Sequence, residues 1–293
     1  MKKIVSLIFA ALFLGAVAAQ AQKIEAVSES QYCITSGDMS LTVDAARGGK
    51  ILSFKYKDKE VLSQTRFPNS FGSTLWTSPQ AQWNWPPVPE YDSKPYKANL
   101  SGDVLVLTGE KSERFGYRIG KKFHVCPNDG AIVITYTIFN ESGETRQVAP
   151  WEISRVPNGG VLFFDAPAVE PGNNMALIPF QFRDGAAWYV MDEAGENRKI
   201  NANGKGWLAF SSGGVLFVKK FPDLADGEAA PAEAEIQVYV NTGKTFVEIE
   251  EQGAYTTLAP GEKLDWTVRW YLLPQPGPDV PSAELLKLAL GGA

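Results

Sequence analysis

The chain has 293 residues, a formal net charge of −5, 44% hydrophobic residues, two cysteines and a single histidine. The acidic balance argues against nucleic acid and anionic membranes as partners, because both select basic surfaces. The one histidine, His124, falls inside a strand-like run, so we expect a packed or half-exposed strand residue rather than a triad or metal centre. No phosphate-binding loop or zinc-hydrolase motif occurs.

The first 21 residues have the pattern of a secretory signal peptide. Two lysines precede an apolar run over 4–19, and Ala19-Gln20-Ala21 is a small-residue cleavage site. The run is shorter than the ~20 residues needed to span a bilayer, so it does not predict a membrane anchor. We expect cleavage after Ala21, a secreted and periplasmic protein, and one domain over 22–293.

Strand patterns dominate the rest of the chain. Alternating or β-branched runs occur at 41–44, 51–56, 61–62, 104–107, 117–125, 131–139, 161–164, 207–210, 215–221, 235–240, 246–250 and 264–272. Turn clusters such as PNDG and NESGE separate them. Only 282–290 has helical spacing, with Ser282 as a cap. These patterns predict an all-β fold, a single large sandwich with a short C-terminal helix.

Three features outside the strand runs give further expectations. The polar stretch 222–235 is expected to be a long solvated hairpin loop. Cys33 and Cys126 are an even pair in an exported chain, which permits one structural disulfide. Each also lies in an apolar strand-like run, so two buried free thiols fit equally well.

The stretch 71–92 holds three tryptophans and four prolines. Prolines lack the backbone donor and fix φ, which predicts a surface loop outside any sheet or helix. Rings held on a stiff loop suit stacking on the apolar C–H faces of sugars. The alternative is that Trp76, Trp83 and Trp85 only pack the loop onto the sandwich.

The segment 147–160 places three sugar-binding residue types within five positions. In a regular strand Trp151 and Arg155 share one face, while Glu152 has the other. A sugar can therefore meet either the ring with the guanidinium or the carboxylate, unless a bulge near Pro150 re-aims one side chain. An ordinary packed strand remains the alternative.

A later segment, 242–274, carries two alternating carboxylates. Alternation places Phe246, Glu248 and Glu250 on one face, with Val247 and Ile249 opposite. Like charges so placed raise each other's pKa where water is limited. A plain solvent-facing strand is equally typical of this pattern.

Three phrases resemble the galactose mutarotase-like, or aldose 1-epimerase-like, β-supersandwich proteins. They are MSLTVDAARGGKILSFKYKDKEVL, AIVITYTIFNESGETRQVAPWEISRV and FVEIEEQGAYTTLAPGE. The first is similar to the opening hairpin of the family, the second to its central strand and the strand entering the sugar site, and the third to its C-terminal catalytic segment. The tryptophan- and proline-rich stretch resembles an uncharacterised secreted bacterial branch.

The resemblance implies roles for particular residues. Glu250 matches the general base of the family and Gln252 its neighbouring glutamine, whereas Glu251 stands where the family commonly has proline. The family's catalytic histidine is expected near 151–152, and this chain has Trp151 and Glu152 there. His124 lies one strand too early to replace it.

Three functions remain as hypotheses. The first is a monomeric periplasmic protein that binds a mono- or oligosaccharide through the three loop tryptophans, Trp151, Arg155, the pair Glu248 and Glu250, and Gln252. The second is an aldose 1-epimerase with Glu250 as base and Glu152 as acid. The third is a glycoside hydrolase using Glu152 and Glu250 as a carboxylate pair. Nothing in the sequence calls for a cofactor or a metal ion, calcium included.

Overall fold

The computed structural model describes residues 22–65, 70–166, 168 and 174–291. The predicted signal peptide lies outside these residues. Within them the chain forms two large antiparallel sheets. The first contains β1 (Gln22–Ala26), β2 (Gln31–Ser36), β3 (Met39–Asp44), β4 (Lys50–Tyr56), β5 (Lys59–Glu60), β6 (Ser73–Ser78), β11 (Arg146–Pro157), β15 (Arg198–Ala202), β18 (Ile236–Val240), β19 (Phe246–Gln252) and β20 (Thr256–Leu258).

The second sheet has ten strands in the described part of the chain. These are β7 (Lys97–Ser101), β8 (Val104–Lys111), β9 (Tyr117–Val125), β10 (Ile132–Asn140), β12 (Val161–Asp165), β13 (Gln181–Arg183), β14 (Ala186–Val190), β16 (Trp207–Ser212), β17 (Val215–Lys220) and β21 (Lys263–Pro274). The helical segments are short: η1 (Gln80–Gln82), α1 (Pro89–Asp92), η2 (Met175–Leu177) and α2 (Ala283–Gly291). The expected all-β sandwich with a short C-terminal helix is confirmed.

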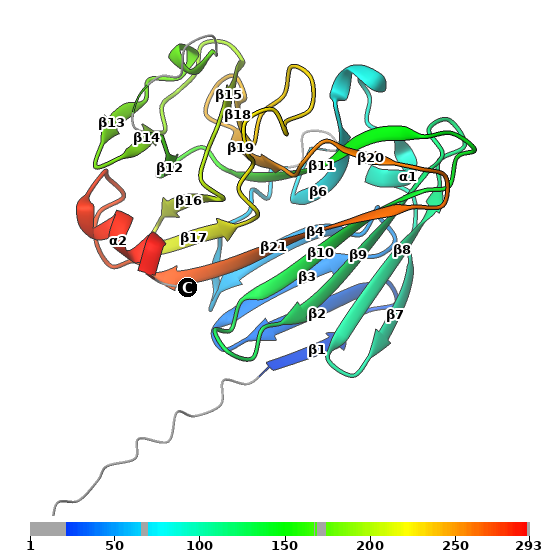
Figure 1. Ribbon diagram of the computed structural model, residues 1–293. Helices are drawn as coiled ribbons and strands as arrows, with labels where there is room; N and C mark the ends of the chain where they lie inside the picture. Colours follow the sequence, from blue (N-terminus) through cyan, green and yellow to red (C-terminus); the bar gives the residue numbers. More distant parts are fainter. Residues whose placement is uncertain (1–21, 66–69, 167, 169–173, 292–293) are drawn as a thin grey trace, which may run out of the picture.

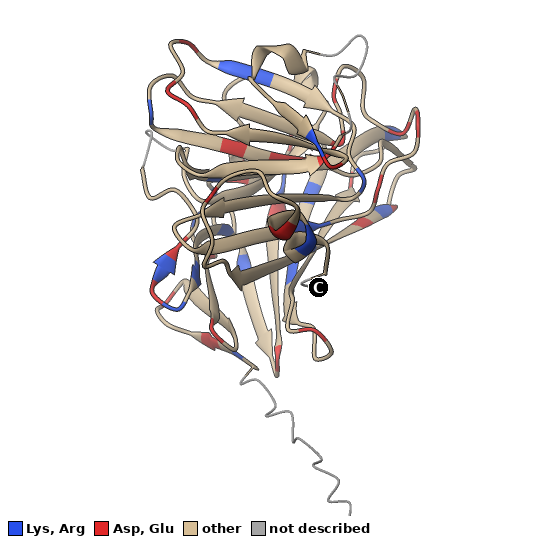
Figure 2. Cartoon of the chain, turned by 90° about the vertical axis from the view of Figure 1, so that its left-hand side faces the viewer, with Lys and Arg blue, Asp and Glu red and all other residues tan. Residues whose placement is uncertain are grey.

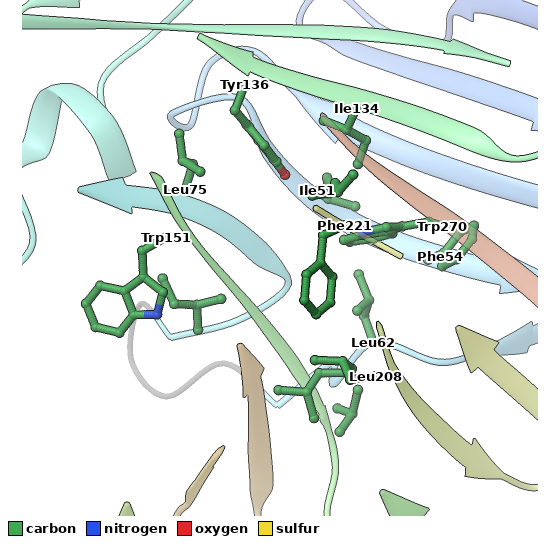
Figure 3. Packing of buried hydrophobic residues seen from close by; sticks show 14 of the residues in the cluster. Ile51, Phe54, Leu62, Leu75, Ile134, Tyr136, Trp151, Leu208, Phe221 and Trp270 are labelled. Carbon is green, nitrogen blue, oxygen red and sulfur yellow. The ribbon is translucent and has the colours of Figure 1, made fainter. Parts of the chain in front are cut away.

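Two twelve-residue strands hold the sandwich together. β21 pairs with β10 in one half of the second sheet and with β17 in the other, and it runs along the molecule in Figure 1. β11 pairs with β6, β19 and β20 in the first sheet. The sheets face each other across one apolar core, where Phe54 and Trp270 meet at 5.4 Å between ring centroids (Figure 3). Lysines, arginines and acidic residues are distributed over strands and loops of both halves (Figure 2).

The strand predictions agree closely with these elements. The run 117–125 coincides with β9, and 246–250 forms most of β19. α2 begins after Ser282, whose Oγ accepts a hydrogen bond from the Leu285 amide at 3.1 Å, as a cap should. His124 lies half-buried in β9, and burial followed by neighbouring cations lowers its pKa. Cys33 and Cys126 are free thiols.

The prediction that the whole of 71–92 is a loop is wrong. Ser73–Ser78 form β6, a fully buried strand that pairs with β4 and β11. The prolines begin only at Pro79, so this strand keeps every backbone donor that its ladder needs. After Pro79 the chain does leave the sheet, and Pro89 begins α1 at a position where its missing donor is harmless.

The segment 222–235 is a largely exposed loop, as expected, but the expectation that it forms a hairpin is wrong. The segment joins β17 to β18, which belong to different sheets, so it crosses the sandwich rather than turning back. Leu224, Ala230 and Glu235 are buried within it. Among the described residues, no helix has the length and apolar run needed to cross a membrane.

Candidate functional site

The register of β11 decides which side chains meet. Trp151 pairs with Trp76 on β6 and with Gln252 on β19, while Arg155 pairs with Glu248. Directly paired residues in an antiparallel ladder share a face. The rings, the guanidinium and these polar groups therefore lie on one face of the first sheet. In Figure 3 the Trp151 indole lies apart from the core side chains around Trp270.

Four tryptophans form a cluster on this face, with Trp76 in contact with the other three. Its ring contacts those of Trp83, Trp85 and Trp151 edge to face, with centroids 5.5, 6.1 and 5.4 Å away. Aromatic quadrupoles favour this geometry. Trp76 Nε1 donates to Asp92 Oδ1 at 3.0 Å, which ties β6 to α1.

The three loop rings differ in their exposure. Trp83 is buried at 4% exposure and donates Nε1 to the Thr77 carbonyl at 2.8 Å, so it packs the loop onto the sheet. Trp85 is 65% exposed although it contacts Trp76. A large ring left open beside three others is free to stack on a ligand.

Two adjoining hollows share Ser70, Trp76 and Trp85. The aromatic hollow, of about 490 Å³, is completed by Gln80, Trp151, Lys199, Tyr239, Asn241, Phe246 and Glu248. The cationic hollow, of about 530 Å³, is completed by Arg47, Lys50, Phe71, Pro86, Pro87, Pro89, Asp92, Ser93 and Arg155. We refer to the two together as the groove. Indoles from the early segment and Glu248 from β19 thus line one hollow.

Glu250 lies directly beneath the aromatic hollow and is fully buried. Its Oε2 accepts the Trp151 Nε1 proton at 2.8 Å, and Lys199 Nζ lies 2.6 Å from both carboxylate oxygens. Burial raises the pKa of Glu250, although Lys199 offsets part of that effect. Lys199 also sits 5.0 Å above the Trp151 ring and is 35% exposed. The lysine therefore separates Glu250 from the open space.

Glu248 and Gln252 flank Glu250 along β19. Arg155 donates Nε to Glu248 Oε1 at 2.9 Å, and its Nη2 lies 2.8 Å from the same oxygen. Gln252 is buried and donates to Glu233 Oε2 at 3.2 Å. Glu233 also accepts the Gln80 amide at 2.9 Å, so the 222–235 crossing is fastened to the groove rim.

Glu152 lies on the opposite face, inside the sandwich. It accepts hydrogen bonds from Ser73, Ser154 and Lys219 at 3.0, 2.8 and 2.7 Å. Lys219 also lies 2.6 Å from Glu251 Oε2, and all three charged side chains have no exposed surface. The structure does not bring Glu152 together with Glu250. The β11–β19 pairing has no bulge and places Glu250 opposite Ile153, so Glu250 and Glu152 lie on opposite faces of the sheet.

Several groove residues were not identified from the sequence. Lys199 lies on β15, whose alternation is too short to predict a strand, and for Tyr239 on β18 the sequence predicts only a strand position. Asp92 ends α1 and binds Lys50 at 3.2 Å. Gly48, at φ +65°, lets the β3–β4 turn approach that helix, since a Cβ there would lie 2.3 Å from the Asp92 carbonyl oxygen.

The described residues contain no group of three histidine, cysteine, aspartate or glutamate side chains placed to hold a metal ion. The chemistry that the groove offers is stacking, hydrogen bonding and ion pairing. A carboxylate with a raised pKa beneath a lysine adds one candidate proton-transfer group.

Comparison of the structure with solved structures shows the fold. A candidate aldose 1-epimerase of Escherichia coli K12 superposes with a TM-score of 0.57 and 13% identity, over 87% of this chain and 100% of that one. A galactose mutarotase-like protein of Lactobacillus casei has a TM-score of 0.54 and 13% identity, over 83% and 100%. The chain has the galactose mutarotase-like fold.

A third structure with this fold covers still more of the chain. It is a candidate aldose 1-epimerase of Klebsiella pneumoniae, with a TM-score of 0.58 and 12% identity over 92% of this chain and 85% of that one. No family model and no curated protein matches the sequence. At these identities the mutarotase-like likeness concerns the fold alone, so function has to be argued from the groove.

Proposed function

We propose that this protein binds a carbohydrate in the groove, as a secreted protein on an aldose epimerase-like scaffold. The observation that carries the proposal is the exposed Trp85 ring, which projects from a buried tryptophan cluster between two hollows. Sugar rings present apolar C–H faces that stack on such a surface. Glu248, Lys199, Tyr239 and Asn241 line the adjacent wall and supply donors and acceptors for hydroxyl groups.

Two features favour binding over catalysis. Mutarotation needs a base for the anomeric hydroxyl and an acid for the ring oxygen. Glu250, the candidate base, is buried and held by Trp151 and Lys199. The expected acid, Glu152, faces the interior, where it is bound to Lys219. A glycoside hydrolase using the same two carboxylates meets the same obstacle.

An aldose epimerase remains the second candidate because of Lys199. Its ammonium contacts Glu250 and lines the aromatic hollow. In this alternative Lys199 swings away from Glu250, which takes the C1 hydroxyl proton while Lys199 protonates the ring oxygen and the bond between C1 and that oxygen breaks. The C1–C2 bond of the open aldehyde then rotates, and the ring re-closes on the other face of the carbonyl by the reverse proton transfers. Burial raises the pKa of Glu250, and a raised pKa makes its carboxylate a stronger base.

Binding and turnover are separated by two assays on the purified protein. Glycan-array binding that is lost in Trp85→Ala, without accelerated mutarotation, supports the binding function. Polarimetry on freshly dissolved α-anomers, showing acceleration that disappears in both Glu250→Gln and Lys199→Met, supports the epimerase. Binding that Trp85→Ala leaves intact contradicts the groove as the site.

Secretion and oligomeric state form the remaining part of the proposal. Expression of the full chain, followed by N-terminal sequencing of the exported form, should identify Gln22 as the first residue. Light scattering of the same material should give the mass of a monomer. Retention of Met1 in the cytoplasm would contradict export.

A further inference from the structure

The cationic hollow concentrates positive charge on an acidic protein. Arg47, Lys50 and Arg155 line it with Asp92 as the one carboxylate among the described lining residues, whereas the whole chain has a formal net charge of −5. The charged residues that line the adjacent aromatic hollow are Lys199 and Glu248, whose opposite charges cancel. The groove therefore has one near-neutral half and one cationic half.

Two of these cations are buried and held in fixed positions, unlike ordinary solvated lysines and arginines on a surface. The side chains of Lys50 and Arg155 are 3% and 2% exposed. Lys50 Nζ lies 4.9 Å from the Phe71 ring centroid and the Arg155 guanidinium carbon 5.6 Å from that of Trp76. The rings hold both groups in place, and ring faces favour cations without neutralising them.

The nearby carboxylates are already committed to partners. Asp92 accepts from Lys50 at 3.2 and 3.4 Å and from Trp76 at 3.0 Å. Glu248 receives Arg155 through Nε and Nη2 on a single oxygen, Oε1. In the part of the chain that the structure describes, the Nη1 group of Arg155 has no acceptor. That donor and Arg47 remain for a ligand.

Arg47 is the exposed member of the set, with 53% of its side chain accessible. Arg47 Nε lies 3.6 Å from Asp44 Oδ2, beyond hydrogen-bond distance, and the other oxygen, Oδ1, accepts from Ser30 Oγ and the Ala46 amide at 2.9 and 3.0 Å. Burial lowers the pKa of Lys50 most, Asp92 opposes that shift, and Arg155 and Arg47 lower the pKa further.

We propose that the cationic hollow binds an anionic substituent, a carboxylate, sulfate or phosphate, of a sugar whose ring stacks on Trp85. This inference rests on the proposed carbohydrate-binding function and names its substrate class. Trp85 and Trp76 line both hollows, so a sugar ring on Trp85 can direct one substituent toward Arg155 and Arg47. Guanidinium groups match the paired oxygens of these anions.

Calorimetric titration of the whole protein with matched ligands tests the proposal. The probes are a galacturonic acid trisaccharide and its methyl ester, which share a skeleton and differ in charge, together with galactose 6-sulfate, galactose 6-phosphate and galactose. We expect at least one anionic probe to bind about tenfold more tightly than its neutral counterpart, with an advantage that shrinks at high ionic strength. The preferred probe identifies the anionic group.

Arg47→Gln provides the matched variant, because an exposed side chain is removed without disturbing the core. It should weaken the preferred anionic probe about three- to fivefold and weaken the neutral probe less, so that the ratio of the two affinities falls. Arg155→Lys keeps the positive charge but loses the planar guanidinium that can donate two parallel hydrogen bonds. A larger loss of affinity for the anionic probe, about tenfold, is therefore expected.

The outcomes distinguish failure of the anionic-sugar inference from failure of carbohydrate binding itself. Equal affinity for charged and neutral probes, unaffected by Arg47→Gln, overturns the anionic-sugar inference and leaves carbohydrate binding standing. Failure to bind any glycan, on this set or on an array, overturns both. Charge-dependent binding that Trp85→Ala does not weaken also overturns the inference, since the ring then has no part in holding the sugar.

Discussion

Trp151 and Glu250 are joined across β11 and β19 by a 2.8 Å hydrogen bond from the indole Nε1 to the carboxylate Oε2. The mutarotase-like resemblance places a histidine near this point, and a histidine can both give and take a proton. An indole N–H is a hydrogen-bond donor only and does not ionise at accessible pH. Trp151 therefore fixes the carboxylate in position and cannot serve as the acid of a mutarotase.

Replacing Trp151 by phenylalanine should show the energetic weight of this bond. Of the described residues that bind the Glu250 carboxylate, the variant leaves Lys199 alone, and a hydrogen bond to a charged group contributes about 1.5–3 kcal/mol. We expect the free energy of unfolding, measured in urea, to fall by that amount beyond the loss of ring area.

The chain provides a matched control in Trp266→Phe. Trp266 is similarly buried, at 5% exposure, but its Nε1 has no hydrogen-bond partner among the described residues. The two variants lose similar apolar area, so their difference isolates the bond. Equal destabilisation of both would mean that the Trp151–Glu250 contact contributes nothing to stability.

The loop tryptophans should separate into a structural ring and a binding ring. Trp83→Ala removes a buried side chain and its bond to Thr77, so it should destabilise the fold by about 3–5 kcal/mol. Trp85→Ala removes a ring that is 65% exposed and should change stability by about 0.5 kcal/mol or less. Thermal unfolding and glycan binding, measured together, should show opposite patterns.

In that experiment the Trp85 variant is expected to lose about tenfold or more in glycan affinity while its midpoint stays at the wild-type value. A Trp85 variant that melts as early as the Trp83 variant would show that this ring, too, is part of the fold.

The sequence predicted one part of this site well for a local reason. Alternation along 246–250 correctly placed Glu248 and Glu250 on one face, because a strand has a period of two whatever surrounds it. It also separated Trp151 and Arg155 from Glu152. Which face meets the groove is not a local property, since both faces of β11 are buried. Burial on both sides removes the hydrophobic-to-polar contrast that normally reveals the outer face.

Long-range strand order accounts for what was missed. Lys199 reaches Glu250 because β15 lies two strands from β19 in the order β19-β18-β15. Arg47 and Lys50 reach the groove because the turn at Gly48 packs on α1, over forty residues later. No periodicity in the sequence encodes these neighbours. Similarly, four prolines in 71–92 obscured the proline-free strand at its start.

The buried charges between the sheets give a third prediction. Lys219 lies between Glu152 and Glu251, and none of the three side chains is exposed. Burial and then the charge of Glu152 raise the pKa of Glu251, so the lysine is the partner that keeps two carboxylates tolerable in the core. Removing one member of such a group leaves a buried charge without its partner, which lowers the free energy of unfolding by about 3–5 kcal/mol.

Lys219→Met should therefore lower the free energy of unfolding by that amount in urea. Lys220→Met, one residue later and half-buried, is the comparison and should have little effect. Combining Lys219→Met with Glu152→Gln and Glu251→Gln should recover part of the loss, because the stranded charges are then gone. A single variant as stable as its Lys220 counterpart would show that the group is neutral to stability.

The buried Lys121 predicts how the free energy of unfolding depends on pH. Its ammonium is buried and donates to the carbonyls of Gly48 and Gly49 in the β3–β4 turn, at 2.7 and 3.0 Å. Burial lowers the pKa of Lys121 to about 7, with Asp92 opposing the shift. In the unfolded chain a lysine titrates near ~10.4. Between these values the unfolded state holds a proton that the folded state lacks.

Stability should consequently rise with pH from about 7 toward about 10 on account of this residue, by at most ~1.4 kcal/mol per pH unit for one proton. Below pH 7 both states are protonated and the contribution is flat. Subtracting the unfolding curves of Lys121→Met from those of the wild type isolates the residue from other groups that titrate in this range. The difference should grow in favour of the wild type as pH rises. A flat difference for Lys121→Met would mean that the lysine remains charged in the folded protein, held by the two carbonyls.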